Sequence, residues 1–95
     1  MEIRQTERFA RWFESLADGQ ARRRIQARID RLEAGNLGDV RAVGGGVSEL
    51  RIDYGPGYRV YLVQRGRTLV ILLAGGDKRT QQRDIATAQK MARNF

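Results

Sequence analysis

The chain has 95 residues, which is enough for a single domain spanning 1–95. Its 18 basic and 11 acidic residues give a net charge of +7, which favours a polyanionic partner: nucleic acid, an acidic protein or an anionic membrane surface. Because the chain has no cysteine and no histidine, disulfides, thiol nucleophiles, ordinary zinc sites and imidazole catalysis are excluded.

No apolar run reaches the length of a transmembrane helix, and the N-terminus lacks the apolar core of a signal peptide. We therefore expect a cytoplasmic protein that does not insert into a membrane and uses neither metal nor cofactor.

The first third of the chain predicts a short edge strand at 1–5 and two helices. Thr6 suits the N-cap of the first helix, whose apolar stripe is Phe9, Trp12, Phe13 and Leu16. Asp18 can cap the second helix, which Gly35 and Asn36 end and whose apolar stripe is Ala21, Ile25, Ile29 and Leu32. The short connection between them predicts an antiparallel helical hairpin.

The exposed flank of the second helix is strongly basic. It carries Arg22, Arg23, Arg24, Arg28 and Arg31, with only Asp30 and Glu33 to offset them. Each arginine alone is typical of a solvated helix face, but the cluster also suits a docking surface for RNA or an acidic partner. We predict RNA contacts for Arg24, Arg28 and Arg31.

A glycine-rich segment, 36–47, follows the second helix and predicts a mobile loop. Gly44-Gly45-Gly46 lacks the strand-to-helix setting and the Lys-Ser/Thr pair of a phosphate-binding P-loop, so it is a weak signal for phosphate.

The stretch from Ser48 to Lys78 predicts three strands joined by two tight turns. Leu50 and Ile52 alternate with polar residues, and Gly55-Pro56-Gly57 forms the first turn. The second strand places Tyr58, Val60 and Leu62 on one face and Arg59, Tyr61 and Val63 on the other. The third strand, 69–74, is apolar on both faces, as in a strand covered on both sides. After it, the flexible backbone of Gly75-Gly76 delivers Lys78 to the rim of the sheet.

A last helix follows, with Thr80 as its expected cap and one face formed by Ile85, Ala88, Ala92 and Phe95. The predicted fold is α+β: an N-terminal helical hairpin and a C-terminal helix packed on a small antiparallel β-sheet.

The strand motifs together resemble the RelE/ParE toxin superfamily. They are Glu-Leu-Arg at 49–51, Gly-x-Gly-Tyr-Arg-Val-Tyr at 55–61, Leu-Leu-x-Gly-Gly-Asp-Lys-x-x-Gln at 72–81 and Asp-Ile-x-x-Ala at 84–88. Within that superfamily, the chain looks most like the HigB-like group called addiction module killer proteins. The resemblance covers nearly the whole chain, from Ile3 to about Arg93.

The resemblance implies a type II toxin neutralised by a cognate antitoxin, commonly one with a helix-turn-helix domain. RelE-like and HigB-like members cleave mRNA in the ribosomal A site, whereas ParE-like members poison DNA gyrase, and the fold does not choose between them. If the chain is a nuclease, the resemblance implies that Arg59 holds the scissile phosphate and that Lys78, with Arg79 beside it as an RNA contact, is the basic pair after the third strand. Arg51 lies on the adjacent strand and is expected to face the same cleft, so Arg59, Lys78 and Arg51 are the predicted catalytic residues.

The sequence does not single out one residue as the proton acceptor for RNA cleavage. Glu49, Tyr54, Tyr58 and Tyr61 are the local candidates, together with Lys78 if neighbouring cations favour its neutral form. Tyr54 is also a candidate RNA contact. Where relatives place a tyrosine on the last helix or a histidine near the C-terminus, this chain has Ile85 and Phe95. Arg51 also has a structural alternative, a cross-strand pair with Asp53 or Glu49.

Three functional hypotheses follow, in this order: a ribosome-dependent mRNA endoribonuclease that needs no metal, a gyrase inhibitor without nuclease activity, and a non-toxic binding module.

Overall fold

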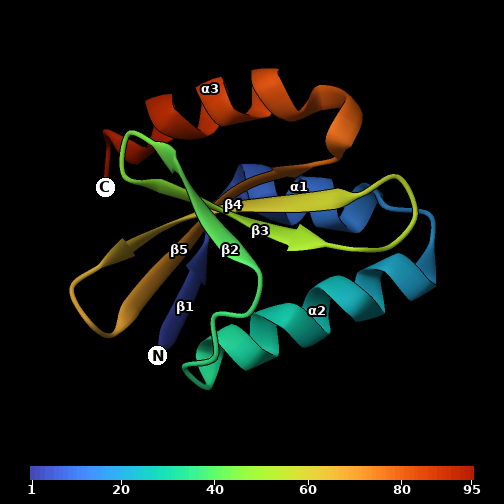
Figure 1. The fold of residues 1–95 in the computed structure, drawn as a ribbon, viewed down its shortest axis with the longest axis horizontal. Helices are drawn as coiled ribbons and strands as arrows, with labels where there is room; N and C mark the ends of the chain where they lie inside the picture. The colour runs from blue at the N-terminus through green and yellow to red at the C-terminus, as the bar shows by residue number, and fades with distance from the viewer.

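The computed structural model describes residues 1–95 as three helices and a five-stranded sheet (Figure 1). The elements in chain order are β1 (Glu2–Gln5), α1 (Glu7–Ser15), α2 (Gly19–Glu33), β2 (Val40–Gly44), β3 (Val47–Ile52), β4 (Tyr58–Arg65), β5 (Leu69–Gly76), a 3-10 turn η1 (Lys78–Thr80) and α3 (Gln81–Ala92). The predicted α+β class is confirmed. None of the helices combines the length and the apolar character needed to cross a bilayer.

The sheet is mixed, with the strand order β1-β5-β4-β3-β2. The pairs from β2 to β5 are antiparallel, as predicted, whereas β1 lies parallel to β5. The expectation of a purely antiparallel sheet is therefore wrong for this one edge strand. The four residues of β1 alternate only weakly between apolar and polar side chains. The direction of β1 is set by its pairing with a strand almost 70 positions later in the chain, where Glu2 lies opposite Leu69.

Helices cover both faces of the sheet, so the protein has three layers (Figure 1). One core lies between the sheet and the helices α1 and α2; it includes Phe9, Ile25, Leu32, Leu50, Val60 and Leu72. The other lies under α3 and includes Val47, Tyr61, Val63, Leu73, Ala88 and Ala92. Strand β5 contributes to both cores, which confirms the expectation of a strand covered on both sides.

The caps predicted for α1 and α2 are present, whereas Thr80 makes no capping hydrogen bond to α3. The Thr6 hydroxyl accepts a hydrogen bond from the Phe9 amide at 3.1 Å, and the Asp18 carboxylate accepts one from the Gln20 amide at 2.9 Å. At the end of α2, Gly35 has a φ of +91°, and the Asn36 amide donates to the Arg31 carbonyl at 2.8 Å. This left-handed glycine closes the helix as the sequence predicted.

Two expectations are corrected. Residues 40–44 form the edge strand β2 rather than a mobile loop, and Gly45 and Gly46 turn the chain into β3 with φ values of +64° and +79°. The sequence pattern does not indicate β2, because this strand pairs on one side only and only Val40 and Val43 are partly covered. Phe95 does not share the buried face of α3; it lies beyond the helix end and is 51% exposed.

The Gly75-Gly76 pair is required for close packing rather than for flexibility. A Cβ atom on Gly75 would lie 2.1 Å from the Trp12 ring, on one face of the sheet. A Cβ atom on Gly76 would lie 1.9 Å from the Asp84 carboxylate, on the α3 side. Because neither side chain has room, this end of β5 packs directly against α1 and α3, and the position of Lys78 just after it is fixed.

Candidate functional site

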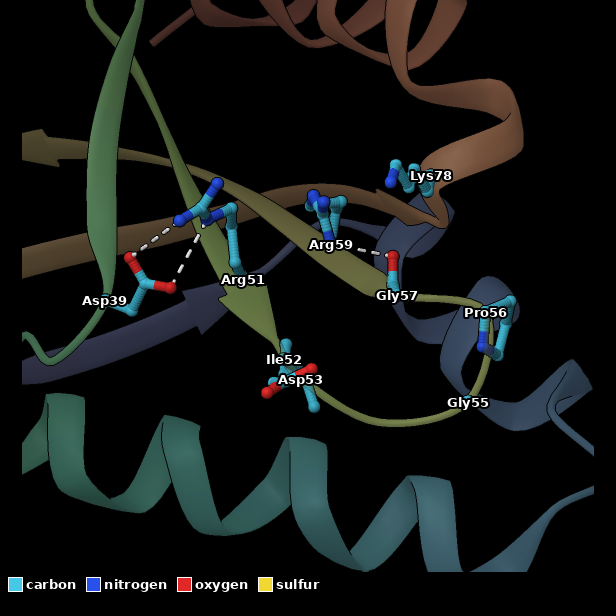
Figure 2. Close-up of a pocket in the computed structure, with 9 residues that line it drawn as sticks. All are labelled: Asp39, Arg51, Ile52, Asp53, Gly55, Pro56, Gly57, Arg59 and Lys78. Atoms are coloured by element: carbon cyan, nitrogen blue, oxygen red, sulfur yellow. Dashed lines mark hydrogen bonds and ion pairs between the residues drawn. The ribbon is translucent and has the colours of Figure 1, made fainter.

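A hollow of about 410 Å³ opens beside the turn that joins β3 to β4 (Figure 2). Its lining is Asp39, Arg51, Ile52, Asp53, Gly55, Pro56, Gly57, Arg59 and Lys78. The three residues predicted to be catalytic, Arg51, Arg59 and Lys78, thus line one cavity, although they come from β3, β4 and the segment after β5. Five of the nine lining residues are ionisable, and only Ile52 and Pro56 are apolar.

Two arginines face each other across neighbouring strands at this site. Arg51 on β3 is the direct register partner of Arg59 on β4. Like charges placed directly opposite in an antiparallel pair are destabilising unless an anion or acidic groups compensate. Each arginine here has its own carboxylate: Asp39 lies 3.3 Å from Arg51, and Glu49 lies 3.6 Å from Arg59. The pair is therefore held in place and remains available to an anion.

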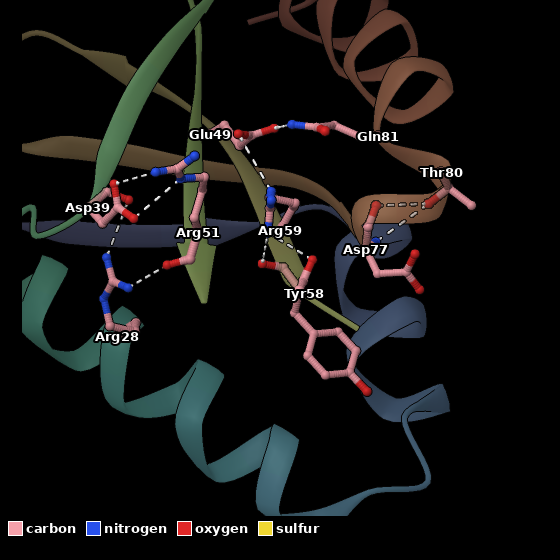
Figure 3. Close-up of polar contacts among 10 residues, drawn as sticks. Arg28, Asp39, Glu49, Arg51, Tyr58, Arg59, Asp77, Thr80 and Gln81 are labelled. Carbon is pink, nitrogen blue, oxygen red and sulfur yellow. Dashed lines mark hydrogen bonds and ion pairs between the residues drawn. The ribbon is translucent and has the colours of Figure 1, made fainter. Parts of the chain in front are cut away.

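The Arg59 side chain is 11% exposed and is fixed from several sides (Figure 3). Its Nη1 donates to the Gly57 carbonyl at 2.8 Å and to the Tyr58 carbonyl at 3.2 Å. Its Nε faces Glu49, whereas Nη2 makes no hydrogen bond within the chain. Nη2 is consequently the guanidinium nitrogen that is free to bind a ligand in the hollow.

Glu49 is a fully buried carboxylate behind Arg59. Its side chain is 0% exposed, and one oxygen accepts a hydrogen bond from Gln81 Nε2 at 2.7 Å (Figure 3). Across the strands lies Tyr61, whose buried hydroxyl has no hydrogen-bond partner. Burial, with the negative charge of Glu49 as the next cause, raises the pKa of Tyr61 above its usual range. Since both residues are fully buried, neither can take a proton directly from a substrate in the hollow.

The Arg51 side chain forms an exposed ion pair, and its backbone carbonyl is bound by Arg28. Asp39, just before β2, accepts from its Nε at 3.3 Å and from its Nη2 at 3.5 Å. The Arg28 side chain of α2 donates to the Arg51 carbonyl at 2.6 Å and to the Asp39 carbonyl at 3.5 Å (Figure 3). Arg28 therefore ties α2 to β3 and to the Asp39 segment, and its burial lowers its pKa. The partner of Arg51 is Asp39, not the expected Asp53 or Glu49.

Lys78 begins η1 as an exposed side chain that forms no ion pair within the chain. The turn that carries it is capped by Asp77, whose carboxylate accepts from the Arg79 amide at 2.8 Å. Arg79 is itself paired with Asp77 at 2.9 Å and lies outside the hollow. The hydrogen bond from the Arg79 side chain lowers the pKa of Asp77. Thr80, the expected cap of α3, instead donates to Asp84 at 2.5 Å.

The remaining predicted RNA contacts lie on α2 and at Tyr54, in the turn between β3 and β4. Arg24 and Arg31 line a smaller hollow of about 160 Å³ that shares Ile52 and Asp53 with the first one. Tyr54 lines neither hollow: its hydroxyl donates to Asp18 at 2.9 Å, and this bond raises the pKa of Tyr54. The Arg24 guanidinium lies over the Tyr54 ring, 4.6 Å from its centre. The two hollows adjoin at Ile52 and Asp53 and together form a track from Lys78 to α2, with arginines or a lysine at both ends and a carboxylate at the junction.

Two acidic lining residues were not singled out as site residues from the sequence. Asp39 lies in the segment predicted to be a loop, and the sequence suggests Asp53 only as a cross-strand partner of Arg51. Asp53 is exposed, lines both hollows and forms no ion pair within the chain. Its position immediately after β3 and before the Gly-Pro-Gly turn is the signal that could have identified it.

Comparison with known proteins places this geometry in a family. The family model "Phage derived protein Gp49-like (DUF891)" matches residues 11–94, which is most of the chain. The chain belongs to this family. A second match is an uncharacterized protein of Haemophilus influenzae, 48% identical over 95 residues and covering 100% of this chain and 96% of the relative.

The Gp49-like chain also matches a solved structure. A chain of the intact E. coli RelBE toxin-antitoxin complex superposes with a TM-score of 0.64 at 15% identity, covering 79% of this chain and 93% of that one. At this identity the match establishes the fold, which is RelE-like, as the sequence motifs predicted. The narrower HigB-like assignment stays a prediction.

Proposed function

We propose that this Gp49-like protein is the toxin of a type II toxin–antitoxin pair and that it cleaves mRNA on the ribosome. The observation that carries the proposal is the hollow in which Arg51, Arg59 and Lys78 converge from three different segments. Two arginines in direct cross-strand register, with a lysine beside them, suit a phosphodiester, whose reaction builds negative charge on the phosphoryl oxygens.

The chemistry of the proposed reaction is attack by a ribose 2′-hydroxyl on the adjacent phosphorus. The 2′-oxygen–phosphorus bond forms, the bond from phosphorus to the 5′-oxygen breaks, and the products are a cyclic phosphate and a free 5′-hydroxyl. Arg59, through Nη2, and Arg51 hold the phosphoryl oxygens. Asp53, the exposed carboxylate without an ion pair, takes the 2′ proton, and the Lys78 ammonium gives a proton to the leaving oxygen.

The track from the hollow to α2 gives the substrate a second point of contact. Arg24 and Arg31 line its far end, at a distance from the phosphate that reacts. We assign them to backbone phosphates of the mRNA or of the ribosome, because contacts of this kind position a nucleic acid without reading its sequence.

The proposed partner is a cognate antitoxin, of the helix-turn-helix type that accompanies HigB-like toxins. Support comes from the RelE-like fold, since the superposed chain belongs to a toxin-antitoxin complex, and from the net charge of +7, which suits an acidic partner segment.

Inhibition of DNA gyrase is the second candidate, and one observation favours it. None of the three tyrosines of the chain lines the hollow, and the chain has no histidine. The site thus lacks histidine, the side chain most often used for acid–base catalysis, and has no tyrosine in its place. A gyrase inhibitor needs a binding surface and no such groups.

The test compares alanine variants during induced expression. Arg59→Ala and Lys78→Ala are expected to lower the cleavage rate by about 10²- to 10³-fold each, since each removes a preorganised cation. Lys90→Ala, which removes the only other lysine, at the far end of α3, is the matched control. Protein, DNA and RNA synthesis are followed by pulse labelling, and mRNA ends by primer extension.

Early loss of translation, with cuts inside translated codons that disappear in Arg59→Ala and Lys78→Ala, supports the nuclease. Replication that fails first, with intact mRNA, supports gyrase. Harmless overexpression indicates a non-toxic binding module. Calorimetric titration with the antitoxin checks that both variants keep their fold and their partner.

A further inference from the structure

We infer that Glu49 is the positioning residue for Arg59: buried and never in contact with substrate, it aims the guanidinium so that Nη2 meets the scissile phosphate. The inference rests on the proposed function and adds to it a residue that acts from behind the site. It also includes Gln81, which holds Glu49 in place.

The first step is the burial of a charge that the fold does not need. Glu49 occupies a β3 position on the face covered by α3, the same face as Val47, which is 1% exposed and lies in the apolar core. A hydrophobic residue there would extend that core, and replacing a buried ion pair by apolar residues is often neutral or stabilising. A buried carboxylate at this position therefore points to a role other than stability.

The second step is the geometry of the pair. Glu49 Oε1 faces Arg59 Nε at 3.6 Å, and both atoms are buried without a hydrogen-bond partner. Beyond hydrogen-bond distance the contact is electrostatic, and low exposure strengthens it. Meanwhile Nη1 is fixed by the carbonyls of Gly57 and Tyr58 at 2.8 and 3.2 Å. A planar guanidinium held at both Nε and Nη1 leaves one orientation for Nη2.

The third step is how Glu49 is held. Its other oxygen accepts the Gln81 Nε2 hydrogen bond at 2.7 Å, and Gln81 is the first residue of α3. The same helix start follows η1, which carries Lys78. The contact thus couples the position of Arg59 on β4 to the segment that brings the lysine to the hollow (Figure 3).

The experiment combines cleavage with a direct probe of Arg59. Glu49→Gln keeps the shape and removes the charge. Gln81→Ala removes the hydrogen bond to Glu49 and keeps the charge, so it stays informative if Glu49→Gln fails to fold. Gln82→Ala, the exposed neighbour on the same helix turn, is the matched control. Each variant is assayed for mRNA cleavage on programmed ribosomes, and the Arg59 Nε–H resonance, assigned with Arg59→Lys, is followed by NMR.

We expect Glu49→Gln to lower the cleavage rate by about 10- to 100-fold, the loss typical of a misplaced catalytic contact, and Gln81→Ala to lower it less. Both should shift the Arg59 Nε–H resonance, and Gln82→Ala should change neither readout. In an Arg59→Ala background, Glu49→Gln should cause no further loss, because its effect runs through Arg59.

Three results overturn the inference: full cleavage by a folded Glu49→Gln protein, an unshifted Arg59 resonance in both variants, or losses that add to those of Arg59→Ala. The last result would make Glu49 a structural residue only. Failure of the proposed function gives a different pattern, in which Arg59→Ala itself cleaves normally or wild-type protein leaves mRNA intact.

Discussion

Replacing Gly76 by alanine tests whether the end of β5 is closely packed rather than flexible. The new Cβ atom would lie 1.9 Å from Asp84 Oδ2 and 3.0 Å from Thr80 Oγ1. Those two side chains are hydrogen-bonded to each other at 2.5 Å, so neither can move freely. Overpacking of this kind costs about 1–3 kcal/mol. For a domain of about this size, each kcal/mol lowers Tm by about 4–8 °C, so Tm should fall by about 4–24 °C.

Thermal unfolding followed by circular dichroism measures the effect. Gly19→Ala is the matched control, because its Cβ would meet only the side chains of Arg22 and Arg23, at 3.6 and 3.7 Å, and should stabilise the helix by about 0.4–1 kcal/mol. In an Asp84→Ala background the Gly76→Ala loss should shrink, because the clashing carboxylate is gone. An unchanged Tm, or an equal loss in both backgrounds, would refute the close-packing explanation.

Two further predictions concern acidic residues. Asp39→Asn removes a negative charge from the hollow. At about 6 Å from a bound phosphate in water, the repulsion by that charge is worth about 0.7 kcal/mol, so RNA affinity should rise about threefold. Fluorescence anisotropy at low salt measures the affinity. Weaker binding would mean instead that Asp39 orients Arg51. Asp77→Asn should lower Tm at pH 7. The hydrogen bond from Arg79 lowers the pKa of Asp77, so its stabilisation is complete above the unfolded pKa of about 3.9 and is lost as the pH falls through the lower folded value. The Tm difference between Asp77→Asn and wild type should close at low pH, and a difference independent of pH would contradict this assignment.

Much of the candidate site could be predicted because its residues come from short-range patterns. Alternation placed Arg59 and Tyr61 on the same face of β4, and the turn residues placed Gly55-Pro56-Gly57 between two strands. The convergence of Arg51, Arg59 and Lys78 followed from adjacent strands and from the motif resemblance. What they do in that hollow stays a prediction.

The partners of these residues could not be predicted, because each comes from a distant part of the chain. Asp39 reaches Arg51 only once β2 has paired with β3. The Arg28 guanidinium is already hydrogen-bonded to the backbone carbonyls of Arg51 and Asp39. The roles predicted for the tyrosines differ most from what the structure allows. Tyr54 is bound to Asp18 and Tyr61 is buried beside Glu49, so two candidate proton acceptors are removed by tertiary contacts.

The sequence by itself determined the α+β class, the caps of α1 and α2, both apolar stripes of the helical hairpin and the strands β3, β4 and β5. These features depend on periods of two and 3.6 and on residues with local backbone preferences. The tertiary structure alone decided the parallel direction of β1, the existence of β2, the packing role of Gly76 and the burial of Glu49. A charged residue in an alternating strand is normally read as facing solvent. Only the placement of α3 over that face determines that Glu49 lies behind Arg59 rather than in water.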